Sequence, residues 1–72
     1  MANKKDILSI VGSNIRKIRI SQKMSQNQLA YETGITREFI NKIETGKYNI
    51  SIKNLEKIAQ ILEIDIKNLL EN

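Results

Sequence analysis

The stretch SQNQLAYETGITREFINKIETG, residues 25–46, decides the fold of this chain. It contains two short helical patterns joined by residues 33–35, Thr-Gly-Ile. Ser25 precedes the first pattern and Thr36 precedes the second, and both side chains can accept a hydrogen bond from an amide of the first helical turn. A glycine-containing turn between two short helices is typical of a helix-turn-helix motif. The sequence therefore predicts this motif at about residues 25–45.

The first helix of the motif has a recognisable start and end. Ser25 and Gln28 have the spacing of a capping box, in which each side chain bonds to the backbone amide of the other residue. Gly34 ends the helix because glycine adopts a left-handed backbone conformation at little cost. Ala30 is small enough to let the two helices approach closely. We expect Ile35, in the turn, to fill the gap between them.

The second helix of the motif is expected from the Thr36 cap to Gly46, with an apolar edge and a polar face. Ile40 and Ile43 are three residues apart and are predicted to face the core. Arginine and lysine can bond to guanine, asparagine to adenine and glutamate to cytosine. The candidate base-reading residues on the polar face are therefore Arg37, Glu38, Asn41 and Lys42. An ordinary solvated helix face would also be polar, so this pattern is not decisive by itself.

Helical spacing predicts three more helices, which makes the fold all-α with five helices. One precedes the motif, from about Lys5 to Lys23. Its apolar residues recur at intervals of three or four: Leu8, Val11, Ile15 and Ile18. Two helices follow the loop Lys47–Ile50, and their predicted N-caps are Ser51 and Asp65. No repeat or linker interrupts the pattern, so we expect residues 1–72 to form a single domain.

Composition argues against several classes of function. The chain has 72 residues with no cysteine and no histidine. It therefore lacks the usual zinc ligands and the commonest general base. We expect no metal, no cofactor and no small-molecule ligand, and an enzyme is a distant third hypothesis because no nucleophile–base pair can be assembled. The apolar stretch Ile7–Val11 is too short for a signal peptide or a membrane span, which predicts a cytoplasmic protein without a membrane partner.

Positive charge is concentrated in the first two-thirds of the chain. Residues 1–47 contain nine Lys or Arg and four Asp or Glu, a net charge of +5. Residues 48–72 contain three Lys and four acidic residues, a net charge of −1. This asymmetry favours a polyanionic partner for the first part of the chain, although a solvated basic surface would look the same.

A helix that reads DNA bases also needs donors for the neighbouring phosphates. Helix N-termini favour phosphate, so Gln26 and Thr36 are candidates in addition to their roles at helix starts. Lys47 adds a positive charge on the same side, unless it is an ordinary surface lysine. Phe39 is a candidate for packing on the sugar-phosphate backbone or a thymine methyl group. Its alternative is partial burial against the preceding helix.

Residues 25–64 resemble the helix-turn-helix of the phage Cro and C1 repressor family, also called the XRE family. The matching positions are Ser25-Gln26, Leu29-Ala30, Gly34-Ile35-Thr36, Ile40, Ile43-Glu44, Gly46, Leu55, Ile58-Ala59 and Leu62. The resemblance implies a lambda-repressor-like domain of five helices that binds an operator in double-stranded DNA as a homodimer. Two positions depart from the family pattern: Ile50 replaces a frequent proline, and Phe39 replaces a smaller polar residue or tyrosine.

The resemblance also implies roles for individual residues. It implies phosphate contacts for Gln26 and Thr36, and base-reading or groove-lining roles for Arg37, Glu38, Asn41 and Lys42. It further implies that Glu44 is a buried acid paired with Arg19, which is credible because an unpaired buried carboxylate is unfavourable. The last two helices have more apolar residues than one small core needs, so we expect a dimer contact formed by Ile61, Ile64, Ile66, Leu69 and Leu70. The alternative is that all five are core residues.

The function implied by the resemblance is sequence-specific regulation of transcription, on a near-palindromic operator, in a bacterium or phage. Such a protein would be nucleoid-associated when bound to DNA. Small members of the family include phage repressors, Cro-like switches, antitoxins and controller proteins of restriction–modification systems. The short length and the stretch KYNISIKNLE, residues 47–56, look most like a controller protein. The alternative is a helical protein-interaction module or an antitoxin that keeps the fold but binds protein.

Overall fold

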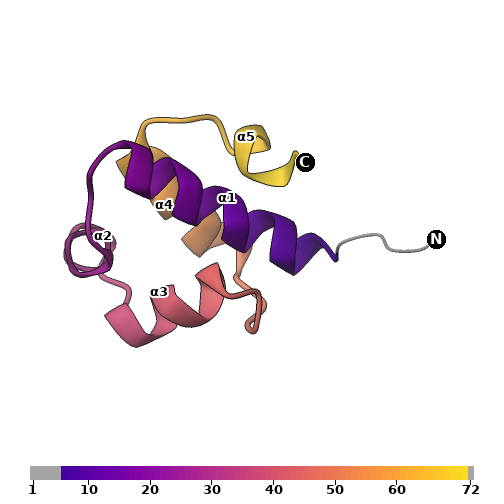
Figure 1. Ribbon diagram of the computed structural model, residues 1–72, viewed down its shortest axis with the longest axis horizontal. Coiled ribbons are helices and arrows are strands. Elements are labelled where there is room, and N and C mark those ends of the chain that lie inside the picture. The colour runs from indigo at the N-terminus through magenta and orange to yellow at the C-terminus, as the bar shows by residue number, and fades with distance from the viewer. Residues whose placement is uncertain (1–5, 72) are drawn as a thin grey trace.

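The computed structural model describes residues 6–71, which form five α-helices and no strand (Figure 1). The helices are α1 (Ile7–Ser21), α2 (Gln26–Thr33), α3 (Arg37–Glu44), α4 (Ile52–Leu62) and α5 (Lys67–Leu70). The predicted all-α fold of five helices is confirmed. Helix α1 crosses the middle of the molecule, with α3 packed on one side of it and α5 on the other. Helix α2 lies at the end of the molecule away from the N-terminus (Figure 1).

Side-chain caps begin three of the helices as predicted. The three bonds run from Gln28 N to Ser25 Oγ (3.0 Å), from Phe39 N to Thr36 Oγ1 (3.2 Å) and from Asn54 N to Ser51 Oγ (3.1 Å). The Gln28 side chain does not complete a capping box. It follows the helix surface instead and donates to Glu32 Oε2 at 3.4 Å, because the residue four positions ahead is its neighbour on the helix.

The ends of α1 differ slightly from the predicted range. The helix begins at Ile7, where the Asp6 side chain accepts from Leu8 N, and the predicted start at Lys5 lies outside the described residues. It ends at Ser21 rather than Lys23. Lys23 adopts a left-handed backbone conformation, with φ of 60°, and this turns the chain toward α2.

The prediction that Asp65 caps the last helix was wrong. The residue before α5 is Ile66, and it provides no side-chain hydrogen bond to the helix. The Asp65 backbone amide instead donates to Asn68 Oδ1 at 3.2 Å. The side chain in this bond therefore belongs to Asn68, within the helix, and not to Asp65. Helix α5 has only four residues, and its position therefore depends on packing rather than on local capping.

All five helices contribute to one hydrophobic core. Its buried members are Val11, Ile15, Leu29, Ile35, Ile40, Ile43, Leu55, Ile58, Ala59, Leu62 and Leu69. Ile35 lies in the turn between α2 and α3 and is buried there, as predicted. Ile18 and Ala30 are partly buried against the same core. The predicted core faces of the helices are thus the ones that the structure buries.

Leu69 was wrongly assigned to a dimer contact. Its side chain has an exposed fraction of 0%, so a second molecule could not reach it. The Leu69 side chain belongs to the hydrophobic core, and the Asn14 side chain on α1 holds the backbone beside it: its amide donates to Leu69 O at 3.0 Å and to Glu71 O at 2.7 Å. These two bonds attach α5 to α1 and place Leu69 over the core.

Two glycines meet different constraints around the helix-turn-helix, one of backbone conformation and one of space. Gly34 ends α2 with φ of 77°, a conformation that glycine adopts without strain. Gly12 faces α3 directly: a Cβ atom at this position would overlap the carbonyl oxygen of Ile43. Gly12 was not identified from the sequence.

The turn between α2 and α3 is closed by Thr33, whose buried hydroxyl donates to Leu29 O at 2.8 Å and accepts from the Ile35 amide at 3.2 Å.

A buried ion pair joins α1 to α3. Arg19 Nε donates to Glu44 Oε2 at 2.7 Å, and Arg19 Nη2 donates to Glu44 Oε1 at 2.9 Å. Both side chains are buried. A third nitrogen of the guanidinium, Nη1, donates to Met24 O at 2.7 Å, in the turn before α2. One arginine therefore connects α1, the turn before α2 and the end of α3.

We predict that Arg19→Met destabilises the fold by about 3–5 kcal/mol, because it leaves the Glu44 carboxylate buried without its main partner. The free energy of unfolding would be measured in urea by circular dichroism. The double variant Arg19→Met/Glu44→Met should recover most of this loss, since no buried charge remains. A double variant that is as unstable as the sum of the two single variants would contradict this explanation.

We also predict that Gly12→Ala lowers the free energy of unfolding by about 1–3 kcal/mol, because α1 must move away from the backbone of α3. At an exposed helix position, replacing glycine by alanine normally raises stability by about 1 kcal/mol. The loss of stability expected for Gly12→Ala therefore has the opposite sign. Lys17→Ala, at an exposed position of the same helix, is the control and should change stability by less than about 0.5 kcal/mol. An unchanged or raised stability of Gly12→Ala would refute the close approach.

Candidate nucleic-acid interface

The outward face of α3 carries the four candidate base-reading residues. All of them are exposed: Arg37, Glu38, Asn41 and Lys42. With 3.6 residues in each turn, they fall in the order Arg37, Asn41, Glu38, Lys42 across an arc of about 140°. The opposite face of α3 is buried in the core through Ile40 and Ile43. The face that remains free therefore has two edges, one at Arg37 and Asn41 and the other at Lys42.

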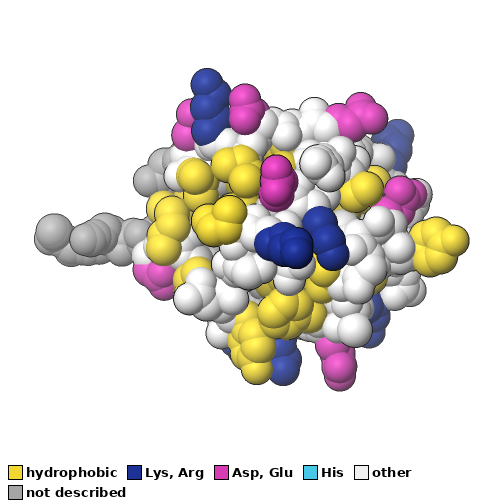
Figure 2. Space-filling model, turned by 180° about the vertical axis from the view of Figure 1, so that it is seen from behind, with side chains coloured by type: hydrophobic (Ala, Val, Ile, Leu, Met, Phe, Trp, Pro, Cys, Tyr) yellow, Lys and Arg dark blue, Asp and Glu magenta, His cyan; other side chains and the backbone are white. Residues whose placement is uncertain are grey.

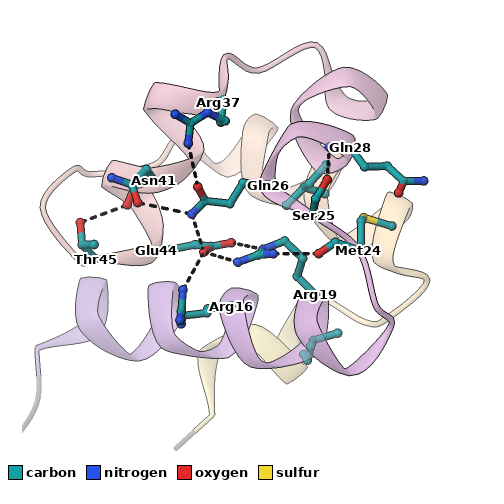
Figure 3. Close-up of polar contacts among 12 residues, drawn as sticks. Arg16, Arg19, Met24, Ser25, Gln26, Gln28, Arg37, Asn41, Glu44 and Thr45 are labelled. Carbon is teal, nitrogen blue, oxygen red and sulfur yellow. Dashed lines mark hydrogen bonds and ion pairs between the residues drawn. The ribbon is translucent and has the colours of Figure 1, made fainter.

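Gln26, the first residue of α2, lies against the Arg37 edge of this face (Figure 3). Its Oε1 accepts from Arg37 Nη1 at 3.5 Å, and its Nε2 donates to Asn41 Oδ1 at 3.3 Å. The same Nε2 donates to Glu44 Oε1 at 3.0 Å. Gln26 thus connects two exposed side chains of α3 to the buried carboxylate. Helix capping in the sequence predicted a phosphate contact for Gln26, but none of these three partners.

Arg16 adds a positive charge beside the same carboxylate. Its Nη1 lies 4.0 Å from Glu44 Oε1, and its side chain is 59% exposed (Figure 3). Glu44 therefore faces two guanidinium groups with a single negative charge, which leaves a net charge of +1 at this place. No role was predicted for Arg16 from the sequence. Its spacing of three residues from Arg19 was the available signal, since such residues share a helix face.

Two aromatic residues and a lysine meet at the other edge. The Lys42 Nζ atom lies 4.8 Å from the centre of the Tyr48 ring. The Tyr48 ring meets the Phe39 ring edge to face, with 5.3 Å between centroids and 84° between planes. Phe39 is partly buried against the core, as the second expectation requires, although its packing against α2 in particular stays a prediction. Tyr48 is 46% exposed and was not selected from the sequence, because only the path of the loop brings it to α3.

The loop between α3 and α4 is anchored at the position where the family often has proline. Ile50 is partly buried there and packs against the core. Lys47 is exposed, just after α3. The apolar Ile50 side chain thus anchors the end of this loop, where the family often has the rigid ring of proline.

Helix starts provide donors near the exposed face of α3. Thr36 Oγ1 accepts from Phe39 N, so its hydroxyl hydrogen remains free to donate outward. Gln26 begins α2, and the amides of both helix N-termini favour an anion. These groups and the positive charges of Arg16 and Arg37 form a surface suited to a polyanion.

Two further features, a membrane-spanning helix and a metal-binding cluster, are absent from the part of the chain that the structure describes. Within residues 6–71, no helix is long and apolar enough to cross a membrane. The same residues contain no group of three or more His, Cys, Asp or Glu side chains that could hold a metal ion.

Comparison with known proteins agrees with this geometry. Residues 15–69 match the family HTH_3, described as helix-turn-helix. Control protein C.BamHI of Bacillus amyloliquefaciens is 40% identical over 67 residues, which cover 92% of this chain and 83% of that protein. The restriction–modification controller protein C.AhdI of Aeromonas hydrophila has a similar structure, with a TM-score of 0.83, 32% identity, and coverage of 86% of this chain and 94% of that one.

A second controller protein, C.Esp1396I, was solved as a tetramer in complex with its natural 35 base-pair operator. Its chain superposes with a TM-score of 0.79 and 36% identity, over 94% of this chain and 100% of that one. The expected resemblance to the XRE family and the expected lambda-repressor-like fold are both confirmed. This chain belongs to the HTH_3 helix-turn-helix family, the XRE or Cro/C1 type of DNA-binding transcriptional regulators, and it is similar to the controller proteins of restriction–modification systems.

Proposed function

We propose that this DNA-binding regulator acts as a homodimer on a near-palindromic operator and has the role of a restriction–modification controller protein. The observation that supports sequence-specific reading is the exposed face of α3, with Gln26 against one edge and Tyr48 against the other. Side chains that are held in position can discriminate bases better than free ones, because less conformational freedom is lost on binding.

In this proposal α3 enters the major groove. Arg37, Asn41, Glu38 and Lys42 contact base edges, as the hydrogen-bonding patterns of guanine, adenine and cytosine allow. Gln26 and Thr36 contact phosphates from the starts of α2 and α3. Lys47, just after α3, and Phe39, in its first turn, adjoin the sugar-phosphate backbone of the DNA. Phosphate contacts fix the register, and base contacts choose the sequence. A near-palindromic site would place the two α3 helices about 34 Å apart in successive major grooves.

The proposed dimer contact lies on the face formed by α4 and α5. Hydrophobic side chains gather on the α5 side of the molecule in Figure 2. Leu70 is 43% exposed, and Ile61, Ile64 and Ile66 are partly buried against the core. These four residues remain from the five that the sequence suggested. Exposed apolar side chains of this kind favour a two-fold contact, because each molecule presents the same patch to the other.

The controller role is supported by similarity rather than by geometry. C.BamHI, a control protein, and C.AhdI, a restriction–modification controller protein, both match this chain over most of their own length. A protein-interaction module with the same fold is the contrasting hypothesis, and it predicts weak DNA binding with little dependence on salt.

We predict that selection from a random DNA pool yields a near-palindromic sequence. Binding to this sequence should weaken steeply as salt increases. A plot of log affinity against log salt concentration should have a slope of about −0.9 for each neutralised phosphate. Arg37→Ala should weaken binding to the selected site by about 1–3 kcal/mol and relax the preference at one base pair. Fluorescence anisotropy with selected and random duplexes measures both effects. Lys57→Ala, at an exposed position on α4, is the control.

Two outcomes would contradict this prediction. A random pool that yields no preferred sequence argues against sequence-specific regulation. An equal loss of affinity by Arg37→Ala on selected and random duplexes would make Arg37 a phosphate contact instead of a base-reading residue.

For the dimer, we predict that sedimentation at micromolar concentration shows two copies for the unaltered chain and one copy for Leu70→Asp, because a carboxylate cannot be desolvated in an apolar contact. Circular dichroism would establish that the variant keeps its helices. Tyr31→Asp, at an exposed position of α2, is the matched control and should remain dimeric. If the unaltered chain is a monomer both alone and on DNA, the dimer proposal fails.

A further inference from the structure

Lys42 differs from the other candidate base-reading residues in how its position is determined. Arg37 and Asn41 have hydrogen-bond partners in Gln26. Lys42 instead places its ammonium group over the Tyr48 ring, 4.8 Å from the ring centre. A lysine is a point charge on a flexible stem of four carbons, so without such a contact it could reach bases and phosphates alike.

The Tyr48 ring is itself supported from the core. Phe39 packs against the buried residues, and the Tyr48 ring meets it at 84°. The positive edge of one ring faces the negative face of the other in such an arrangement, which favours a defined angle. A continuous series of contacts thus runs from the core through Phe39 and Tyr48 to the ammonium group of Lys42.

The ring contact leaves Lys42 able to donate. An aromatic face attracts a cation through the ring quadrupole. Unlike an acceptor oxygen, the ring does not use the N–H groups of the ammonium in conventional hydrogen bonds. The ammonium has three N–H donors, and those pointing away from the ring remain available. Lys42 is exposed and Tyr48 is nearly half exposed, so this edge of α3 is open to a ligand.

We propose that Tyr48 is a positioning residue that determines specificity: its ring holds the Lys42 ammonium so that the lysine reads one base pair instead of contacting phosphates without preference. This inference rests on the proposed function, because it concerns how the DNA-reading face of α3 chooses sequence. It adds a residue of the following loop to the determinants of specificity and gives a role to the contact between Tyr48 of that loop and Phe39 of α3.

The experiment compares four variants on the selected duplex and on duplexes changed at each base pair in turn. Lys42→Met identifies the base pair that depends on Lys42. Tyr48→Leu should reduce the preference at that same base pair by about two- to fivefold, the size of an exposed cation–π contact. Affinity for random duplex should stay unchanged, because the lysine charge is still present. Tyr48→Phe should keep the full preference, since it keeps the aromatic face.

The fourth variant, Lys42→Met/Tyr48→Leu, tests whether the two residues act together. It should match Lys42→Met alone, because the ring has no effect without the ammonium group. Tyr31→Leu, which removes an exposed tyrosine from α2, is the control and should leave every preference unchanged. Circular dichroism and thermal unfolding would show that the Tyr48 variants remain folded.

Several results would overturn the inference. Additive losses in the double variant would mean that Tyr48 contacts DNA independently, and equal losses for Tyr48→Phe and Tyr48→Leu would assign the effect to the hydroxyl group. An unchanged or tighter preference for Tyr48→Leu would also contradict it. These failures are distinct from failure of the proposed function, in which the unaltered chain selects no sequence at all.

Discussion

The rest of the structure depends on the buried ion pair between Arg19 and Glu44. Removing two charges from water is unfavourable by several kcal/mol per ion, so such a pair is tolerated only when its geometry is good and its other hydrogen bonds are satisfied. Both conditions are met: the pair is bidentate, Arg19 also donates to Met24 O, and Glu44 also accepts from Gln26. Gly12 permits the close approach of α1 and α3 that this pair requires.

The ion pair is also connected to the exposed face of α3, because polar contacts extend from Glu44 to the surface. Gln26 bonds to the buried Glu44 and to exposed Asn41, and it accepts from Arg37 as well. The opposite edge is supported by apolar contacts, from the core through Phe39 to Tyr48 and Lys42. One edge of the face is thus held by hydrogen bonds and the other by aromatic packing. In both cases an exposed side chain takes its position from a buried one.

Membership of the HTH_3 family accounts for the frame, and the proposed choice of DNA sequence depends on a few side chains. The residues that build the frame are buried, whereas those proposed to read DNA are exposed and differ in chemistry along the helix. The loop after α3 shows how this chain modifies the family pattern. Ile50 packs against the core at a position where proline is frequent, and Tyr48 of the same loop contacts Lys42.

The sequence by itself determined the helices, their caps at Ser25, Thr36 and Ser51, and the core face of each long helix. These features depend on residues within one or two turns of each other, so local spacing is enough to predict them. Only the tertiary structure decided which segments meet. Asn14 bonds to Leu69 O across 55 positions, Gln26 reaches Glu44 across 18 positions, and Tyr48 reaches Lys42 only through a non-helical loop. Such contacts arise from the packing of whole helices, which no local pattern specifies.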